Sequence, residues 1–422
     1  MKKWFLRIGL GFFAFLALLY GFVMLRSIIP ATVNDGNLRL ARASIPEGSN
    51  AFDVLQVGAS HLWWPDNQSQ QLFDLARDTN WNGNLASTVV ANNREMLAAW
   101  DAAAKLPDFQ VPEISNVNAS VSYLSDWKKM AQVAGVRENF LFHSGRDKEA
   151  FDQIVDQIQL GRRMQNSQSA LIGYLVGMAV NTMGLSQIQH WAGRTHLNPD
   201  QLKPCILQLE FDPDDEGAAF ANTMRAEYQS AIGTVDAMRK GKMADADTGK
   251  AYPHPTRLLP VLNFSKTKAL FAGEFNALVK AGPHHFNEAK LPDLFTNQPG
   301  LISMALSGNI LGQIWFGLLA PAVIPSLAKK SQADAQLQAT RTILALRAYQ
   351  LTHGNLPSDL NALVPEFLDA VPVDDFDGQP LRYAPDRKIV YSVGQNLKDD
   401  GGNDSRSGPS NRPLDLVYNF DF

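Results

Sequence analysis

An uncharged apolar run near the N-terminus constrains this chain more than any other feature of its sequence. Residues 8–25 read IGLGFFAFLALLYGFVML and contain no charged side chain. A helix over this run, extended through Trp4 and Phe5, rises about 1.5 Å per residue and therefore matches a hydrocarbon layer of roughly 30 Å. We predict a transmembrane helix with residues 4–25 in contact with the lipid bilayer.

The charges that flank this run predict its orientation. Lys2, Lys3 and Arg7 precede or open the run, whereas only Arg26 follows it closely. Because positive charge is retained on the cytoplasmic side, we expect a cytoplasmic N-terminus and a periplasmic body, in a single-pass protein of the bacterial inner membrane. The alternative is a cleaved signal peptide, which usually has a shorter apolar region and a small-residue cleavage site. Here the run ends in VMLRS at residues 23–27, so we expect an uncleaved signal-anchor.

Two later stretches, 164–193 and 294–328, also lack charged side chains. Both contain several Asn and Gln residues, and the second contains prolines as well. Amide side chains facing lipid are costly, so we expect both stretches to form helices buried inside a soluble domain. The alternative is a second transmembrane span over 301–320, which would return the C-terminus to the cytoplasm.

Composition limits the classes of function. The 422 residues are enough for two or three domains, and 45% hydrophobic with 19% charged residues is typical of a globular protein. A net charge of −4 gives no general basic field, so we expect no nucleic-acid partner. Cys205 is the single cysteine, which excludes an intramolecular disulfide and any multi-cysteine metal site. We expect it to be a buried apolar residue rather than a nucleophile.

Apolar residues recur at helical spacing through most of the chain after the first 50 residues. The spacing predicts helices over 121–142, 150–160, 168–192, 199–210, 215–239, 265–281 and 300–319. Proline- or glycine-rich loops are expected over 105–112, 241–260 and 282–299. We predict a mainly α fold: a transmembrane helix, a helical bundle or short solenoid, and a small C-terminal α+β module.

The composition changes near residue 331, where we place a domain boundary. An amphipathic helix is predicted over 331–352, ending at the capping residue Gly354. After a turn at 374–378, strands are predicted at 380–384, 388–393 and 414–420, which gives a two- to three-stranded antiparallel sheet. The predicted organisation is therefore 1–29 for the cytoplasmic tip and anchor, 30–330 for the helical domain, and 331–422 for the module.

The module resembles the globular end of the major pseudopilins of type II secretion. In that family a long helix leads to a proline-bounded loop, a D-P-x-G-x-P-type turn, an aromatic strand and an S-x-G strand. The matching positions are Pro372, Asp374, Phe376, Gly378, Pro380, Tyr383, Tyr391, Ser392 and Gly394. Uncharacterised membrane-anchored bacterial envelope proteins that end in the same module are similar to this chain over its helical region too.

The chain departs from the pseudopilin pattern near its N-terminus. A prepilin-peptidase site needs a glycine and then a glutamate at the fifth position, but Gly11 is followed by FFAFL, with Leu16 at that position. The module also lies some 300 residues after the apolar run instead of continuing it. We therefore expect the chain to carry the module as a detachable part, not to form a filament.

The pseudopilin resemblance implies calcium binding by an acidic loop. The candidate ligands are Asp399, Asp400, Asn403 and Asp404, whose hard oxygen atoms lie within six residues among glycines. Ten acidic and four basic residues between 356 and 404 give this region a local acidic excess. The alternative is a solvated polar turn, since Asp, Asn and Gly are ordinary loop residues and their spacing fits no EF-hand.

Three serine–lysine pairs match the S-x-x-K pattern of periplasmic acyl-transfer enzymes. They are Ser125–Lys128, Ser265–Lys268 and Ser326–Lys329. The S-D-N and K-T-G elements that accompany such a pair are missing, so we interpret the matches as chance.

Other polar and aromatic groups have a functional and a structural interpretation. His284, His285 and Glu288 would form a metal site on a helix, but histidines after Gly-Pro usually lie in a solvent-facing loop. The segment 61–65, with two tryptophans, would line a ligand groove or anchor helix packing. The pair Arg162-Arg163 would clamp an anion or be solvated at a helix end. We expect the structural interpretation in each case.

No motif names a reaction, so we expect a non-enzymatic envelope protein that acts as a helical scaffold or interaction module. Its partner would be another envelope protein, bound in a groove between helices. One alternative is an envelope enzyme with an unrecognised site in the helical domain; another is an accessory component of a type II secretion-like system. A pocket with convergent catalytic side chains would favour the enzyme, and a shallow apolar groove would favour the binder.

Overall fold

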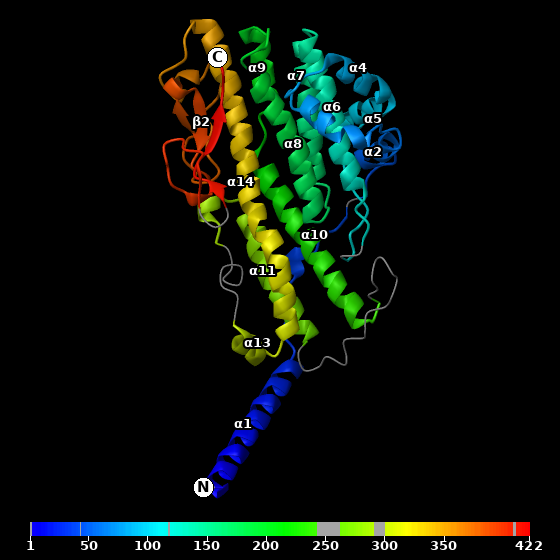
Figure 1. The fold of residues 1–422 in the computed structure, drawn as a ribbon, viewed down its shortest axis with the longest axis vertical. Coiled ribbons are helices and arrows are strands. Elements are labelled where there is room, and N and C mark those ends of the chain that lie inside the picture. The colour runs from blue at the N-terminus through cyan, green and yellow to red at the C-terminus, as the bar shows by residue number, and fades with distance from the viewer. Residues whose placement is uncertain (1, 43, 117–118, 243–261, 291–299, 408–410) are drawn as a thin grey trace.

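The computed structural model describes residues 2–42, 44–116, 119–242, 262–290, 300–407 and 411–422. An elongated helical body has one long helix, α1 (Lys2–Ile28), projecting from one end (Figure 1). We call the end of the body beside α1 the base and the opposite end the distal end. The predicted loops over 241–260 and 282–299 fall for the most part outside the described residues.

Four short helices pack around a longer one on one side of the body (Figure 1). The short helices are α2 (Ala51–Ala59), α3 (Ser69–Ala76), α4 (Gly83–Asn92) and α5 (Arg94–Lys105). The longer one is α6 (Tyr123–His143). Their shared core contains the fully buried rings of Trp100 and Trp127.

Helices α6, α7 (Asp147–Gln165) and α8 (Leu171–Trp191) run alternately up and down the body. Glycines let α7 and α8 approach closely, because a Cβ atom on Gly161 would lie 2.6 Å from the backbone nitrogen of Asn181. A Cβ on Gly177 would lie 2.7 Å from the backbone nitrogen of Gln165. No larger residue fits at this crossing without separating the two helices.

The remaining helices include one that runs the length of the body. They are α9 (Pro199–Gln208), α10 (Pro213–Arg239), α11 (Phe264–Ala281), α13 (Leu301–Ser307) and α14 (Ile310–His353). The 44 residues of α14 give a length of about 66 Å. It extends from the base to the distal end (Figure 1).

The prediction of separate helices over 300–319 and 331–352 is wrong. Helix α14 continues through Pro321 and Pro325, although each proline removes a backbone N–H and costs stability in a helix interior. Buried apolar residues on one face, Phe316, Val323 and Leu327 among them, belong to the same cluster as α11. This packing outweighs the local cost of the prolines.

The C-terminal module carries the small antiparallel sheet that the sequence predicts. Its three strands, in the order β1-β2-β5, are β1 (Arg382–Ala384), β2 (Ile389–Ser392) and β5 (Leu416–Asn419). A separate two-stranded ribbon joins β3 (Arg406–Ser407) and β4 (Arg412–Pro413). The prediction of a mainly helical chain with a small antiparallel sheet is confirmed.

The module shares its core with the helical body. One hydrophobic cluster contains Phe151 of α7, Leu185 of α8 and Leu344 of α14 together with Val390 of β2 and Phe420, which follows β5. An ion pair of 3.0 Å between Lys330 and Asp375, with both side chains at least nine-tenths buried, also connects α14 to the module. The expected domain boundary at 330/331 thus falls inside α14 and beside this ion pair.

Two described helices, α8 and α14, are long and apolar enough to cross a membrane. This is weak evidence of membrane association, because the core helix of a soluble protein meets the same criterion. Within α8, 61% of the apolar window is buried in the body, as expected for a core helix. In α14 only 38% is buried. In α1, a shorter apolar stretch covers Ala17–Ile28.

Candidate ligand-binding pocket

A cavity of about 370 Å³, lined by both polar and apolar side chains, opens between α3, α6, α8 and α14. Its volume lies within the range of about 300–1,000 Å³ that is usual for small-molecule sites. Cationic and amide side chains, including Arg77, Lys128, Gln132, Gln187 and Gln336, share its wall with apolar ones. The residues that line it contain no carboxylate.

Several of these polar groups have no partner in the described parts of the chain. Arg77 and Lys128 are exposed, and neither is within ion-pair distance of a described carboxylate. The side chain of Gln132 is more informative because the residue is only 6% exposed and its amide makes no hydrogen bond to any described residue. A buried amide that faces a cavity without a partner favours a bound polar group.

Asp78 holds two histidines where the cavity meets the distal end. Its Oδ1 lies 2.7 Å from Nε2 of His143, and its Oδ2 lies 2.9 Å from Nε2 of His190, which lines the cavity. Arg194 lies 3.7 Å from the same carboxylate, and Trp81 stacks on the ring of His143. The Asp78 backbone has φ of +53°, an uncommon conformation for a non-glycine residue.

This arrangement fixes the rings but lacks the hydrogen bond that activates a nucleophile. The hydroxyl group of Ser186, which also lines the cavity, donates to the carbonyl of Thr182 and accepts from Gln336. Among the described residues, no serine, threonine or cysteine side chain is hydrogen-bonded to His143 or His190. A nucleophile and its base would be expected within hydrogen-bond reach of each other.

A buried polar network behind the cavity positions the end of α3. Asn139 donates to the carbonyls of Leu75 and Ala76 and accepts a hydrogen bond of 3.0 Å from the indole of Trp191. Gln187 donates 2.9 Å to the carbonyl of Gly135. These contacts hold the last turn of α3, from which the chain continues directly into the residues that border the cavity.

Glu138 lies next to this network and is completely buried. Burial raises the pKa of its carboxyl group to about 8, and the nearby Arg137 opposes that shift only in part. Arg137 is itself committed to a bidentate pair with Asp101, at 2.8 Å for both contacts. Glu138 is therefore mainly protonated at neutral pH, and it is an uncharged part of the core.

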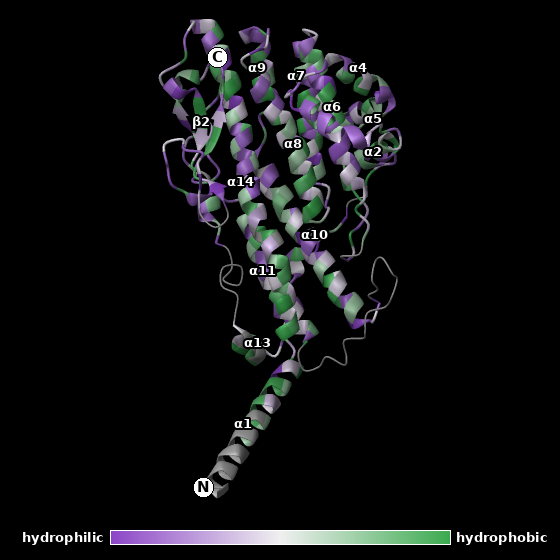
Figure 2. Cartoon of the chain, in the orientation of Figure 1, coloured by the Kyte–Doolittle hydropathy of each residue, from purple (hydrophilic) through white to green (hydrophobic). Residues whose placement is uncertain are grey.

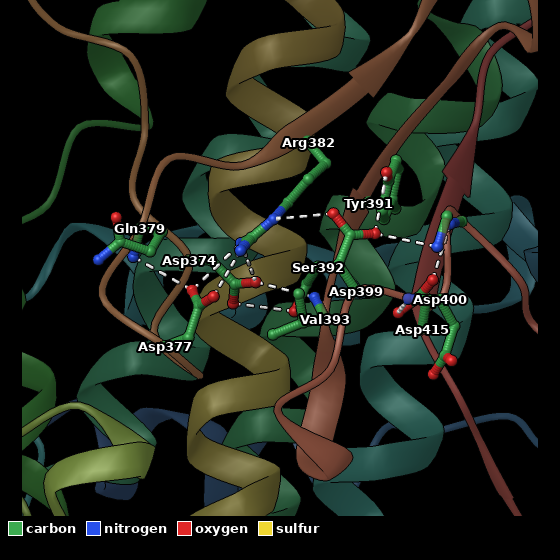
Figure 3. Close-up of polar contacts among 12 residues, drawn as sticks. Asp374, Asp377, Gln379, Arg382, Tyr391, Ser392, Val393, Asp399, Asp400 and Asp415 are labelled. Carbon is green, nitrogen blue, oxygen red and sulfur yellow. Dashed lines mark hydrogen bonds and ion pairs between the residues drawn. The ribbon is translucent and has the colours of Figure 1, made fainter.

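The predicted calcium ligands lie on one loop of the module, where the structure gives most of them other partners (Figure 3). Asp399 accepts from the hydroxyl of Tyr391 at 3.2 Å and lies 3.9 Å from Arg382. Asp400 accepts from Asn396 at 2.8 Å. The side-chain oxygen of Asn403 accepts from the backbone of Ser405, and Asp404 is exposed.

The centre of this loop is a carboxylate that the sequence analysis did not single out. Asp415 is fully buried and accepts backbone hydrogen bonds from Gly402 at 2.7 Å, Asn403 at 3.0 Å and Asp400 at 3.4 Å. The N–H groups of the loop thus point inward, whereas a calcium loop directs oxygen atoms inward. Among the described residues, no three His, Cys, Asp or Glu side chains form a metal-binding group. Calcium binding stays a prediction.

A second buried carboxylate connects the turn at 374–378 to the end of β2. Asp374 is fully buried and accepts from the hydroxyl of Ser392 at 2.8 Å and the backbone of Val393 at 2.9 Å (Figure 3). Arg382 lies 3.2 Å from Asp374 and also pairs with Asp377. Burial raises the pKa of Asp374, and these amide and hydroxyl donors oppose the rise. The turn and the S-x-G strand are thus tied together by one carboxylate.

The serine–lysine pairs do not form in the structure. The hydroxyl group of Ser265 donates to Asn263, while Lys268 pairs with Asp236 at 2.7 Å. The hydroxyl group of Ser326 donates to a backbone carbonyl of its own helix. The interpretation of these matches as chance agrees with the geometry.

The remaining candidates have structural contacts. His285 pairs with Asp375 at 3.1 Å, whereas His284 lies 3.7 Å from Glu288. Burial raises the pKa of the Cys205 thiol to about 11, and the residue is 1% exposed, as expected for a packing residue.

The tryptophans and arginines are also used in packing. Trp63 and Trp64 pack against the core cluster around α6. The expectation that Arg162 and Arg163 are solvated was wrong. Arg162 lies 3.3 Å from Glu216 with 14% of its side chain exposed, and Arg163 donates to the carbonyl of Ala104.

Comparison with models of protein families, with curated proteins and with solved structures finds no match for this chain. The site is therefore defined by its own geometry. Sequence reasoning missed Asp78, Gln132 and Asp415, because their sequence context is that of an ordinary turn, helix and strand end.

Proposed function

We propose that this protein is a membrane-anchored, non-enzymatic envelope protein whose helical body presents the cavity between α3, α6, α8 and α14 to a partner. In this proposal α1 crosses the bacterial inner membrane once, with the N-terminus in the cytoplasm and the body in the periplasm. The partner is an envelope protein that inserts an acidic group into the cavity. The observation that supports this proposal most directly is the cavity wall, which combines two unpaired cations with an unpaired amide of a buried residue.

The end of α1 is fastened to the body, which supports a scaffold of fixed orientation. Asn263 donates from its side chain to the carbonyls of Ser27 at 2.7 Å and Ile29 at 2.9 Å. Lys266 donates to the carbonyl of Arg26 at 2.6 Å. These side chains satisfy carbonyl groups that a helix end leaves without partners. A rigid joint holds the cavity at a fixed distance from the bilayer.

The charges and hydrogen-bonding groups of the cavity favour an acidic peptide segment. Arg77 and Lys128 complement a carboxylate, and the surrounding amide side chains complement peptide N–H and C=O groups. Apolar side chains such as Phe73 and Met183 also line the cavity, but unlike the apolar groove expected for a binder it carries charged and amide groups as well. Its specificity would therefore come from charge and hydrogen bonds.

The proposal is tested by crosslinking in intact cells, followed by mass spectrometry of the captured proteins. The test variant is the double substitution Arg77→Gln with Lys128→Gln. The matched control is Lys129→Gln, since Lys129 neighbours Lys128 but lies outside the cavity and over the ring of Trp64. We expect the test variant to lose a captured partner that the wild type and the control retain. The same capture from all three would reject the cavity as the binding site.

The topology is tested separately. A reporter that is active only in the cytoplasm, fused after Phe422, should be inactive, and a periplasmic reporter at the same position should be active. Activity of the cytoplasmic reporter alone would reject the proposed orientation. Recovery of a mature chain that begins after Arg26 would reject the uncleaved anchor.

A second candidate is an envelope enzyme, which is favoured by the contact of Asp78 with two histidines at the cavity rim. A carboxylate that fixes an imidazole is a recurrent part of general-base sites. The discriminating change is His190→Gln, which should abolish turnover of a hydrolysable ester or amide probe if the enzyme interpretation holds. Equal turnover by wild type and variant would reject it.

A further inference from the structure

A patch of exposed apolar side chains lies at the base of the body. It consists of Ile302 and Leu306 on α13 and Ile314 and Leu318 on the first turns of α14, and we call these four residues the base patch. Their exposed fractions are 78%, 41%, 40% and 75%. Residues 301–328 contain no charged side chain at all. Contiguous exposed apolar surface of this kind marks a contact with a membrane or a partner.

The position of the patch indicates which of these it contacts. Of the 18 large hydrophobic side chains exposed in the described residues, eight lie between Phe15 and Ile29 and four form the base patch. The other six are scattered over the rest of the body. In Figure 2 the upper turns of α1 and the lower parts of α11 and α14 carry much of the hydrophobic colour. Exposed apolar surface thus gathers where the body meets α1.

The patch is fixed to the end of α1. Helix α13 contacts α1. A Cβ atom at Gly308, which has φ of +67°, would lie 2.6 Å from the carbonyl carbon of Arg26. Lys266 donates to the carbonyls of both Arg26 and Ser307, at 2.6 Å each. The patch therefore cannot move far from the point at which α1 leaves the body.

Cationic side chains lie at two places near the base, in the last turn of α1 and at the end of α10. Arg26 ends α1, and Arg239, Lys240 and Lys242 follow one another at the lower end of α10; all four are exposed. Figure 1 places the lower ends of α10, α11 and α14, with α13, at the level where α1 joins the body. An apolar surface with exposed cations at the same end of the body complements a bilayer that contains anionic lipids.

We propose that the base patch is a second membrane contact, at which α13 and the first turns of α14 lie in the interfacial layer of the leaflet where α1 emerges. This inference rests on the proposed function, because it takes α1 to cross that bilayer. The body then contacts the membrane both through α1 and through the base patch, which prevents it from rotating about the end of α1. The occupant of the patch is lipid.

The structure favours an interfacial position over a second transmembrane span. Helix α13 has only seven residues, about 10 Å of helix. The opposite face of α14 is engaged, since Phe316, Ala320 and Val323 are at most 3% exposed and belong to the cluster that contains α11. A span over 301–320 would have to remove these side chains from the body.

The test measures the depth of single labelled positions in the full chain, reconstituted into vesicles of phosphatidylethanolamine and phosphatidylglycerol. A polarity-sensitive fluorophore is attached after Ile302→Cys, Leu318→Cys, Phe15→Cys or Leu351→Cys in a Cys205→Ala background. The fluorophore is then quenched by lipids whose acyl chain carries a nitroxide either near the headgroup (shallow) or near the bilayer centre (deep). Phe15 is the control for the bilayer interior, and Leu351, exposed and at the distal end of α14, is the control for water.

We expect Ile302 and Leu318 to be quenched several-fold more by the shallow than by the deep nitroxide, Phe15 more by the deep one, and Leu351 by neither. Repeating the labelling with Cys205 retained checks that the background substitution has not altered the fold, because that thiol is buried.

The outcomes separate this inference from the proposed function. If labels at Ile302 and Leu318 are quenched no more than the label at Leu351, while Phe15 is still quenched by the deep nitroxide, the membrane contact of the base patch is rejected. The transmembrane anchor would remain supported. Quenching of Ile302 as deep as that of Phe15 would replace the patch by a second span. An unquenched Phe15 would remove the anchor itself.

Discussion

Glu138 offers the sharpest test of the energetics of the helical body. The residue is completely buried on α6, and neither carboxylate oxygen makes a hydrogen bond of normal geometry to a described residue. Burial raises the pKa of the carboxyl group from 4.5 to about 8. The folded protein therefore keeps a proton that the unfolded chain releases above pH 4.5. The contribution of Glu138 to the free energy of unfolding is fully present below pH 4.5 and is lost as the pH rises through about 8.

The size of the effect follows from this pKa difference. Each pH unit between the two pKa values changes the free energy of unfolding by about 1.4 kcal/mol. With a folded pKa of about 8, the wild type should lose about 4 kcal/mol between pH 5 and pH 9 through Glu138. The Glu138→Gln variant has no proton to lose at this position. Its stability relative to wild type should rise by the same amount over that range.

The assay is urea denaturation of the full chain in detergent micelles, followed by tryptophan fluorescence at pH 5, 7 and 9. The hydrogen bonds of the new amide change the free energy of unfolding by an amount that does not depend on pH. The diagnostic quantity is therefore how the difference in free energy of unfolding between variant and wild type changes with pH. Other acids whose pKa values are raised, such as Asp334, Glu227 and Asp374, act equally in both proteins, so their contributions cancel.

The matched control is Glu149→Gln, which makes the same chemical change at an exposed residue paired with Arg146. Its denaturation midpoints should follow those of the wild type at every pH. If Glu138→Gln also follows the wild type, Glu138 is not neutral in the folded protein, and the reasoning from its burial is refuted.

Four further predictions follow from the geometry. Asp415→Asn should lower the free energy of unfolding by about 1–3 kcal/mol, whereas the exposed control Asp404→Asn should change it by less than about 0.5 kcal/mol; equal urea midpoints would contradict this. Gly161→Ala should lower the free energy of unfolding by about 1–3 kcal/mol, because the new Cβ would lie 2.6 Å from a backbone nitrogen of α8. An unchanged urea midpoint would show that the two helices can separate without loss of stability. Lys330→Met should lower the free energy of unfolding by about 3–5 kcal/mol, because it removes the buried cation paired with Asp375 and leaves that carboxylate with its contact to His285. Adding Asp375→Asn should recover part of the loss, and a double-mutant cycle with no coupling would contradict this prediction. Calcium should raise the melting temperature of the full chain above that in chelator, and equal midpoints would end the calcium prediction.

The sequence was sufficient where local patterns decide the structure. Helical spacing placed α6, α8, α10 and α11 within two or three residues of their observed ends. The predicted stop of the long helix is also confirmed, because α14 ends at His353 and Gly354 follows with φ of +80°. The turn at 374–378 and the three strands rest on equally local signals, namely glycine, proline and alternating apolar residues.

Contacts between distant segments decided the rest. The cavity joins Arg77 of the α3 end to Lys128, His190 and Gln336, so its wall comes from segments up to some 260 residues apart. No local pattern marks such a set, because each side chain alone is an ordinary polar residue of a helix or turn. The same holds for Asp415, which organises a loop that begins more than ten residues before it.

The amino-acid sequence by itself determined the helical class, the small sheet and the uncharged N-terminal run, since each depends on side chains within a few turns of one another. Only the tertiary structure decided that α14 is one helix through two prolines, that the module shares the core of the helical body, and that Glu138 is buried without a charge partner. The physical reason is that burial and packing are set by residues far away in the chain. They outweigh local preferences of a few kcal/mol only once the fold has formed.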